Sequence, residues 1–174
     1  MNFEISEAQP NDANQLYGIQ RESWLETYPN IEAGISRQDI EDNFSDTEKG
    51  INKWNKWLET PRENVHIWKM GNKEKIIGFC IASKGNMENK LSAIYVLPEY
   101  QNKGHGSSLA FKALEWLGNE KGITVEVASY NEQAIKFYNK LGFKYSHVVT
   151  DITNGILPNG KFIPQIQMIR TKKV

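Results

Sequence analysis

Apolar and polar positions divide the first part of the chain into a strand, helices and a hairpin. Residues 3–8 alternate weakly and predict an edge strand, whereas residues 13–28 have the spacing of an amphipathic helix. A second helical region is expected within residues 40–58, after a Ser-Arg-Gln-Asp sequence that resembles a capping box. Two strands, residues 65–70 and 75–83, follow on either side of Gly71-Asn72, which is a typical hairpin signal.

The second part of the chain alternates strands with helices. The expected elements are a strand at 91–97, a helix that ends at 121–122, a strand at 123–128, a helix at 131–141, a strand at 143–150, a turn-rich loop at 154–160 and a last strand at 162–170. This order predicts an α+β (mixed α/β) fold, in which helices cover both faces of a mixed sheet. The 174 residues contain enough apolar side chains for one core, so we expect a single domain over residues 1–174.

Composition and charge exclude several classes of function. Lys plus Arg and Asp plus Glu number 21 each, so no bulk basic field exists for nucleic acid. No apolar segment approaches the roughly 20 residues that cross a bilayer, and the first residues lack the pattern of a signal peptide. We therefore expect a cytoplasmic protein. The single cysteine, Cys80, lies in an apolar run and is expected in the core, and the three histidines have no metal-ligand spacing.

A phosphate-binding turn is predicted between the strand at 91–97 and the helix that follows. Residues 101–106 are Gln-Asn-Lys-Gly-His-Gly, and glycines at the start of a helix let a phosphate approach the free backbone N–H groups. A P-loop would need a Gly-Lys-Ser/Thr ending, and a dinucleotide fingerprint would need glycine where Leu109 stands. A nucleotide-binding domain therefore depends on the glycine pair alone.

Two motifs make the chain resemble the GNAT superfamily of acyl-CoA N-acyltransferases. The first is Gln-x-x-Gly-x-Gly at residues 101–106, which follows a Val-x-Pro strand end. The second is Asn-x-x-Ala-x-x-Phe-Tyr-x-x-x-Gly-Phe at residues 131–143. The resemblance is specific over residues 89–149 and rests on element order elsewhere. It implies a mostly antiparallel sheet whose two central strands splay apart, with the pantetheine arm of acetyl-CoA between them.

The resemblance also implies which residues hold acetyl-CoA. The backbone of the central strand would pair with the pantetheine, and the turn would hold the pyrophosphate. These residues are Ile94, Tyr95 and Val96 in the strand, and Gln101, Asn102, Lys103, Gly104, His105, Gly106 and Ser107 in the turn. Asn131 and Tyr138 lie two helical turns apart, so both would reach the cofactor. Their alternatives are an ordinary helix cap and a half-buried core tyrosine.

The implied chemistry is acetyl transfer to a primary amine. Tyr138 would act on the leaving thiolate, and the amide of Val96 would polarise the thioester carbonyl. An amine of pKa about 10.4 is neutral in only about one molecule in two thousand at pH 7, so a base is needed. Many relatives carry a glutamate near position 90, where this chain has Lys90, which leaves Glu126 as the first candidate base. A solvated strand face, or waters leading to a more distant carboxylate, are the alternatives for Glu126.

The acceptor site is expected beside the first two helices. Trp24 and Tyr28 precede a proline there, a run similar to one in bacterial polyamine acetyltransferases, and aromatic rings can hold a cationic amine. The alternative for Trp24 is a core residue. The resemblance therefore implies an N-acetyltransferase for a polyamine-like small molecule or a peptide, and a homodimer formed by the strands near Phe162 could occur. A non-catalytic acyl-CoA-binding module is the alternative function.

Overall fold

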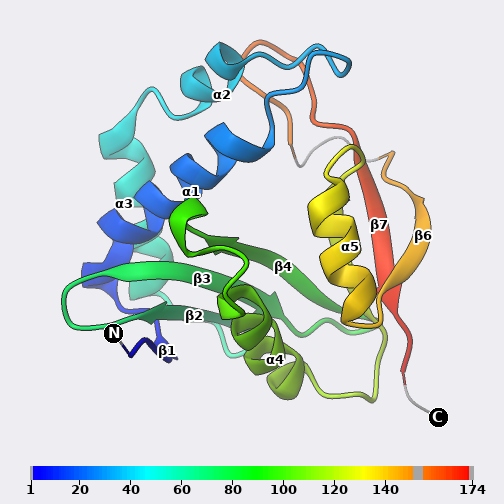
Figure 1. Ribbon diagram of the computed structural model, residues 1–174. Coiled ribbons are helices and arrows are strands. Elements are labelled where there is room, and N and C mark those ends of the chain that lie inside the picture. The colour runs from blue at the N-terminus through cyan, green and yellow to red at the C-terminus, as the bar shows by residue number, and fades with distance from the viewer. Residues whose placement is uncertain (1, 151–154, 173–174) are drawn as a thin grey trace.

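The strands form one sheet of seven in the computed structural model, which describes residues 2–150 and 155–172. Their order across the sheet is β1-β2-β3-β4-β5-β7-β6 (Figure 1). The strands are β1 (Glu4–Glu7), β2 (Val65–Gly71), β3 (Ile76–Ser83), β4 (Asn89–Val96), β5 (Ile123–Ala128), β6 (Lys144–Val148) and β7 (Gln165–Arg170). The helices are α1 (Ala13–Thr27), α2 (Arg37–Asn43), α3 (Thr47–Glu59), α4 (His105–Leu117) and α5 (Glu132–Lys140).

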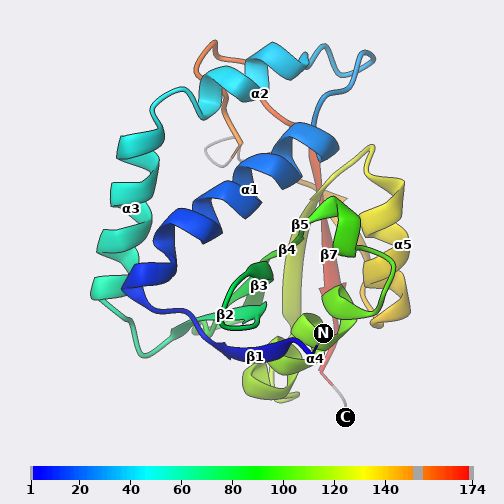
Figure 2. The ribbon, with the colours of Figure 1, turned by 60° about the vertical axis from the view of Figure 1, so that its left-hand side comes forward.

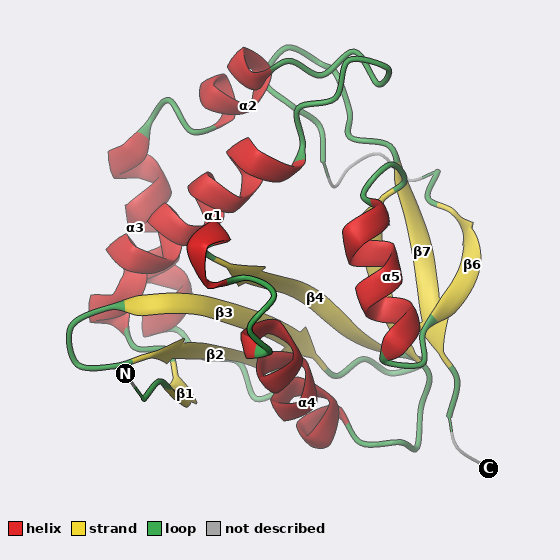
Figure 3. Cartoon of the chain, viewed as in Figure 1, coloured by secondary structure: helices red, strands yellow, loops and turns green. Residues whose placement is uncertain are grey.

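Helices cover both faces of this sheet. The side chains of α1, α2 and α3 pack into one buried cluster, and those of α4 and α5 pack into the other. Figure 2 shows the first three helices together on one side of the strands, and Figure 3 shows α4 and α5 on the other. Cys80 is fully buried in the cluster beneath α4, and burial raises the pKa of its thiol to about 12. The expected fold class is confirmed, and Cys80 lies in the core as expected.

The strands β4 and β5 separate along their length. They run parallel and pair only at Asn89–Ile123 and Lys90–Thr124, while all other neighbouring strands are antiparallel. The buried Asn89 side chain donates to the Leu117 carbonyl at the end of α4, which holds α4 against the closed end of the two strands. Beyond these pairs, the facing edges of β4 and β5 are open. The splayed central strands are therefore present.

Three predicted element boundaries are wrong. The last strand, predicted over residues 162–170, begins at Gln165 in β7, and Phe162 forms only an isolated bridge with Ile156. The helical region within 40–58 is two helices, because the chain turns at Phe44 and Asp46 starts α3 by accepting a hydrogen bond from the Lys49 amide. The helix α4 ends at Leu117, before the expected residues 121–122, because Gly118 takes a positive φ of 75° that ends the helix. Part of the predicted loop at 154–160 lies outside the described residues, since the description resumes at residue 155.

The capping box at the start of α2 is confirmed, and it also anchors a distant loop. The amide of Ser36 donates to Asp39 at 2.7 Å, and the Asp39 amide donates to the Ser36 hydroxyl at 3.1 Å. The same carboxylate accepts hydrogen bonds from the side chains of Asn159 at 2.6 Å and Lys161 at 2.7 Å. The hydrogen bond from Lys161, followed by that from Ser36, lowers the pKa of Asp39 to about 2. Asp39 therefore joins α2 to the loop that precedes β7.

Asp39→Asn is expected to destabilise the fold at neutral pH by an amount that shrinks on acidification. A carboxylate with a lowered pKa stabilises the folded state above its unfolded pKa of about 3.9, and this contribution is lost as the pH falls through the folded value of about 2. Urea unfolding measures the free energy of unfolding of both proteins. The part of their difference that comes from the Asp39 charge should be constant above about pH 5 and roughly halved near pH 3. If the difference in free energy of unfolding did not depend on pH, the lost contacts, and not the charge, would be the cause of the destabilisation.

Candidate active site

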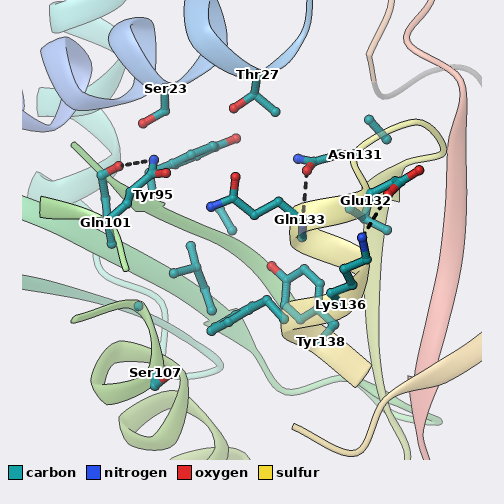
Figure 4. Close-up of a pocket in the computed structure, with 18 of the residues that line it drawn as sticks. Ser23, Thr27, Tyr95, Gln101, Ser107, Asn131, Glu132, Gln133, Lys136 and Tyr138 are labelled. Carbon is teal, nitrogen blue, oxygen red and sulfur yellow. Dashed lines mark hydrogen bonds and ion pairs between the residues drawn. The ribbon is translucent and has the colours of Figure 1, made fainter. Parts of the chain in front are cut away.

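A cleft of about 860 Å³ opens where β4 and β5 diverge. Its wall is built by α1, β4, the turn before α4, β5 and α5, and Figure 4 shows side chains from these elements converging on it. The predicted site residues that line it are Tyr28, Ile94, Tyr95, Val96, Gln101, Asn102, Gly104, Gly106, Ser107, Glu126, Asn131 and Tyr138. Residues from distant parts of the sequence therefore meet at one opening in the sheet.

The turn before α4 presents backbone N–H groups to this cleft. Gly104 is the N-cap of α4 with φ of 86°, and no side chain caps the helix. A Cβ added at Gly106 would lie 3.8 Å from Phe137 and 3.9 Å from Val96, which is ordinary van der Waals contact. The packing of the protein thus tolerates a Cβ atom at Gly106. Gly106 itself lines the cleft. An anion such as a pyrophosphate fits this arrangement of amides and helix dipole.

Lys103 and His105 lie on the outer side of the turn and do not line the cleft. The Lys103 ammonium donates to the Glu99 carbonyl at 2.7 Å and lies 5.5 Å from the centre of the Tyr100 ring. The His105 ring packs edge-on against Phe3, with ring centres 5.6 Å apart. Any part that these two residues take in binding would come through their backbone.

The edge of β4 offers unpaired peptide groups to the cleft. The Leu97 amide donates to the Ile77 carbonyl of β3 at 2.9 Å, and the peptide groups of an antiparallel ladder alternate in direction. The peptide groups of Val96 and Ile94 therefore point away from β3, toward the open side. The Val96 carbonyl accepts a hydrogen bond from the Gln101 side chain at 2.9 Å, which leaves the Val96 N–H facing the cleft.

Asn131 and Tyr138 come from the two ends of α5. The side-chain oxygen Oδ1 of Asn131 accepts a hydrogen bond from the Ala134 backbone amide at 3.0 Å, so Asn131 caps the helix, and the residue also lines the cleft. Tyr138 is buried, and burial, followed by repulsion from Tyr95, raises its pKa well above the usual value for tyrosine. The Tyr138 phenol thus keeps its proton throughout the ordinary working range of pH.

Lys90 and Glu126 form an ion pair at the closed end of the cleft. The Lys90 ammonium lies 2.8 Å from Glu126 Oε1, and their side chains are 35% and 22% exposed. Glu126 lines the cleft, so the pair keeps one carboxylate oxygen occupied and leaves the second for other partners. The two residues that the sequence singled out separately therefore interact directly.

The predicted acceptor residues have different surroundings. Tyr28 lines the cleft, and its pKa is raised well above the usual value, first by burial and then by the neighbouring Tyr95 hydroxyl. Trp24 packs behind it with ring centres 4.8 Å apart, and its indole N–H donates to the Tyr95 hydroxyl at 2.9 Å. Trp24 thus orients Tyr95, and it is not among the cleft-lining residues.

Several lining residues escaped the sequence analysis, notably Ser23, Thr27 and Ser92. Ser92 is the extra residue of a bulge in β4, between the pairs Ala93–Ile81 and Leu91–Ala82. Ser23 and Thr27 are four residues apart, and so share a face of α1. No motif marks any of these three, because small hydroxyl residues are common on solvated surfaces.

Most of the chain matches one known protein family. The family model described as "Acetyltransferase (GNAT) family" matches residues 15–143, which is most of the chain. The chain belongs to the GNAT family. Members of this family are acetyltransferases that use acetyl-CoA. The expectation from the two sequence motifs is confirmed at the level of the family.

Individual GNAT proteins resemble this chain along nearly its whole length. Spermidine N(1)-acetyltransferase of Thermoplasma acidophilum is 29% identical over 153 residues, which cover 83% of this chain and 89% of that protein. The solved PaiA N-acetyltransferase of the same organism, in complex with coenzyme A, matches with a TM-score of 0.73 at 22% identity over 98% of this chain and 99% of its own. The ribosomal-protein-S18-alanine N-acetyltransferase of Escherichia coli matches with a TM-score of 0.65 at 20% identity, over 99% and 97%. The two structural matches show that the fold is shared.

The described residues also limit other kinds of site. No helix within residues 2–150 and 155–172 has the length and apolar character to span a membrane. Over the same ranges, no three His, Cys, Asp or Glu residues gather closely enough to hold a metal ion.

Proposed function

We propose that this GNAT protein is an acetyl-CoA-dependent N-acetyltransferase that acts on a primary amine of a small molecule or a peptide. The observation that carries the proposal is the cleft between the separated strands β4 and β5. The N-terminus of α4, which no side chain caps, and the edge of β4, which has free peptide groups, both line this cleft. An extended thioester with a pyrophosphate at its far end has the matching chemistry. The coenzyme A bound to the similar PaiA structure supports this choice of ligand.

In the proposed complex, the pyrophosphate lies against the amides of residues 102–107, where Gly104 and Gly106 leave room for it. The backbone amide of Gln101 is not among them, because it donates to the Pro98 carbonyl at 3.1 Å. The edge of β4 from Ile94 to Val96 hydrogen-bonds the pantetheine in the manner of an added strand. The Asn131 side-chain amide, already fixed by its helix cap, donates to the same arm. Each of these groups is held in place before the ligand arrives, which limits the entropy lost on binding.

Bound acetyl-CoA supplies an acetyl group on a thioester, whose thiol is a fair leaving group with pKa near 8.5. The Val96 N–H faces the cleft and would stabilise negative charge on the carbonyl oxygen, an effect worth roughly 3 kcal/mol for one well-placed donor. Tyr138 would donate its phenolic proton, or a hydrogen bond, to the departing sulfur. The raised pKa of Tyr138 supports this role, because the phenol stays protonated.

The amine attacks in its neutral form and must lose one N–H proton as the amide bond forms, and we propose Glu126 as the base that accepts this proton. Its carboxylate lines the cleft and keeps one oxygen beyond the bond to Lys90. Tyr28 forms part of the acceptor wall, and Trp24 supports that wall through its hydrogen bond to Tyr95. The spermidine and alanine acetyltransferases among the similar proteins make a polyamine-like amine and a peptide amino group the two first acceptors to test.

One observation favours a second function, a non-catalytic acyl-CoA-binding module. The resemblance to the family leads us to expect a glutamate near position 90, where this chain has Lys90, and the Lys90 ammonium lies 2.8 Å from Glu126. A protein that had lost the acceptor reaction could retain such a pair and still bind acetyl-CoA. Turnover with any amine would exclude this alternative.

Acetyl-CoA is expected to raise the thermal midpoint by about 5–10 °C when present at about 100 times its dissociation constant. A ligand that binds only the folded state then adds roughly 2.7 kcal/mol, and the size of this domain sets the conversion to temperature. Thermal scans with acetyl-CoA, ATP and NAD check this result. A rise with ATP or NAD instead would overturn the proposal, and thiol release with spermidine or an alanine-initiated peptide then separates the enzyme from the binding module.

A further inference from the structure

Ser23 of α1 carries a buried hydroxyl group that the fold does not use. The residue is 4% exposed, and its Oγ atom has no hydrogen-bond partner among the residues that the structure describes. Ser23 belongs to the cleft wall, and Figure 4 shows its side chain extending from α1 toward the cavity. A buried hydroxyl without a partner destabilises a protein, and because Ser23 also lines the cleft, a ligand bound there can supply the missing partner.

The part of the cleft next to Ser23 is rich in uncharged oxygen atoms. Thr27 lies one turn further along α1 and extends into the same space in Figure 4. Tyr28 and Tyr95 add two hydroxyl groups whose raised pKa values keep them neutral. The Tyr95 hydroxyl already accepts the indole N–H of Trp24. Ser23 and Thr27 therefore offer oxygen lone pairs to a donor, such as the N–H group of an amine.

The charged side chains of the wall do not provide a competing site for an ammonium ion. The two carboxylates in the lining, Glu126 and Glu132, lie 2.8 Å from Lys90 and 2.9 Å from Lys136 respectively. Both lining carboxylates are thus paired to lysines, and neither offers an uncompensated negative charge that would hold the amine as an ammonium ion. Neutral oxygen acceptors bind a neutral amine through its N–H groups while its lone pair stays free to attack.

We propose that Ser23 is a specificity-determining residue, whose Oγ accepts a hydrogen bond from the attacking amine and thereby selects primary over secondary amines. The inference rests on the proposed N-acetyltransferase function and deepens it. A neutral primary amine has two N–H groups, so it can give one proton to the base and keep the other on Ser23. A secondary amine has one N–H and cannot satisfy both partners. Ser23 thus holds the nitrogen in the orientation for attack.

The test compares Ser23→Ala with the parent enzyme on a matched pair of amines. The first amine is the best primary substrate among spermidine, butylamine and an alanine-initiated peptide, and the second is the N-methyl derivative of that substrate. We expect kcat/KM for the primary amine to fall about tenfold, which is 1.4 kcal/mol. The N-methyl amine should lose less than twofold, because its single N–H is already committed to the base. The inhibition constant of the N-methyl amine replaces kcat/KM if that amine is not turned over. The KM for acetyl-CoA should not change.

The thermal midpoint provides a second measurement that separates ligand binding from a structural role. Removing an unpartnered buried hydroxyl should raise the midpoint of Ser23→Ala by about 2–4 °C, so activity and stability move in opposite directions. Ser45→Ala makes the same chemical change at an exposed position and should leave the kinetic constants unchanged.

Equal losses of kcat/KM on both amines, or a lower thermal midpoint for Ser23→Ala, would overturn the assignment of Ser23. Neither result would contradict the proposed N-acetyltransferase function. A parent enzyme that binds acetyl-CoA but acetylates no amine would instead overturn the proposed function, and the role of Ser23 with it.

Discussion

Replacing Tyr138 by phenylalanine is expected to lower kcat about 100-fold and to leave the affinity for acetyl-CoA within twofold of the parent value. The variant keeps the buried ring and its edge-on packing on Phe137 and Phe143, so the fold should not change. It removes only the hydroxyl that faces the cleft and would assist the departing sulfur. Loss of a positioned proton donor lowers a rate by about 100-fold or more. A thiolate is weakly basic and leaves with little help from a proton donor, so we expect a loss at the lower end of this range.

The pH profile of kcat gives a second test of the role proposed for Tyr138. The pKa of Tyr138 is raised by burial, so the protonated form that its proposed role requires persists as the pH increases through the working range. Between about pH 6 and pH 9, Tyr138→Phe should therefore reduce kcat by a constant factor without changing the shape of the profile. Stopped assays of thiol release over this range, with isothermal titration of acetyl-CoA, provide the measurements.

Tyr145→Phe is the matched control, because Tyr145 is 60% exposed on the edge strand β6. It should behave as the parent enzyme in both assays. Unchanged turnover in Tyr138→Phe would remove Tyr138 from the proposed chemistry, whereas a large loss of acetyl-CoA affinity would assign it to binding instead.

Adding a side chain at Gly106 is expected to weaken acetyl-CoA binding by about 10- to 100-fold without unfolding the protein. The new Cβ of Gly106→Ala would make only ordinary contacts with Phe137 and Val96, and alanine is the better residue in a helix. The methyl group would nevertheless occupy the space beside the α4 amides through which a pyrophosphate approaches. We expect about tenfold weaker acetyl-CoA binding for Gly106→Ala and about 100-fold for Gly106→Asp, whose charge also repels the phosphates.

Gly18→Ala is the control for this substitution. Gly18 lies within α1, has an ordinary negative φ and has no heavy atom within 4 Å of an added Cβ, so the change in helix propensity is comparable. Its thermal midpoint should rise slightly while acetyl-CoA titration stays the same. If Gly106→Asp bound acetyl-CoA as tightly as Gly18→Ala, the pyrophosphate would lie elsewhere and the proposed position of the cofactor would be wrong.

Short-range signals explain why the strand, turn and helix around residues 101–106 were predictable as local structure. The strand end at Pro98, the glycines of residues 101–106 and the helix that follows lie within one stretch of chain, where local stereochemistry governs the structure. The Asn131 cap depends on the amide of Ala134, three residues away. The division of residues 40–58 into two helices was missed because it depends on a turn at Phe44, which packs against Tyr17 and Trp24 of α1.

The sequence by itself determined the order of strands and helices, the family motifs and the N-terminal turn of α4, because each depends on neighbours within a few residues. Only the tertiary structure decided that Lys90 lies against Glu126, 36 residues away, and that Trp24 bonds Tyr95 across 71 residues. It also decided that Ser23 points its hydroxyl into the cleft. A helix fixes which residues share a face, but packing against the sheet decides whether that face meets solvent, core or ligand.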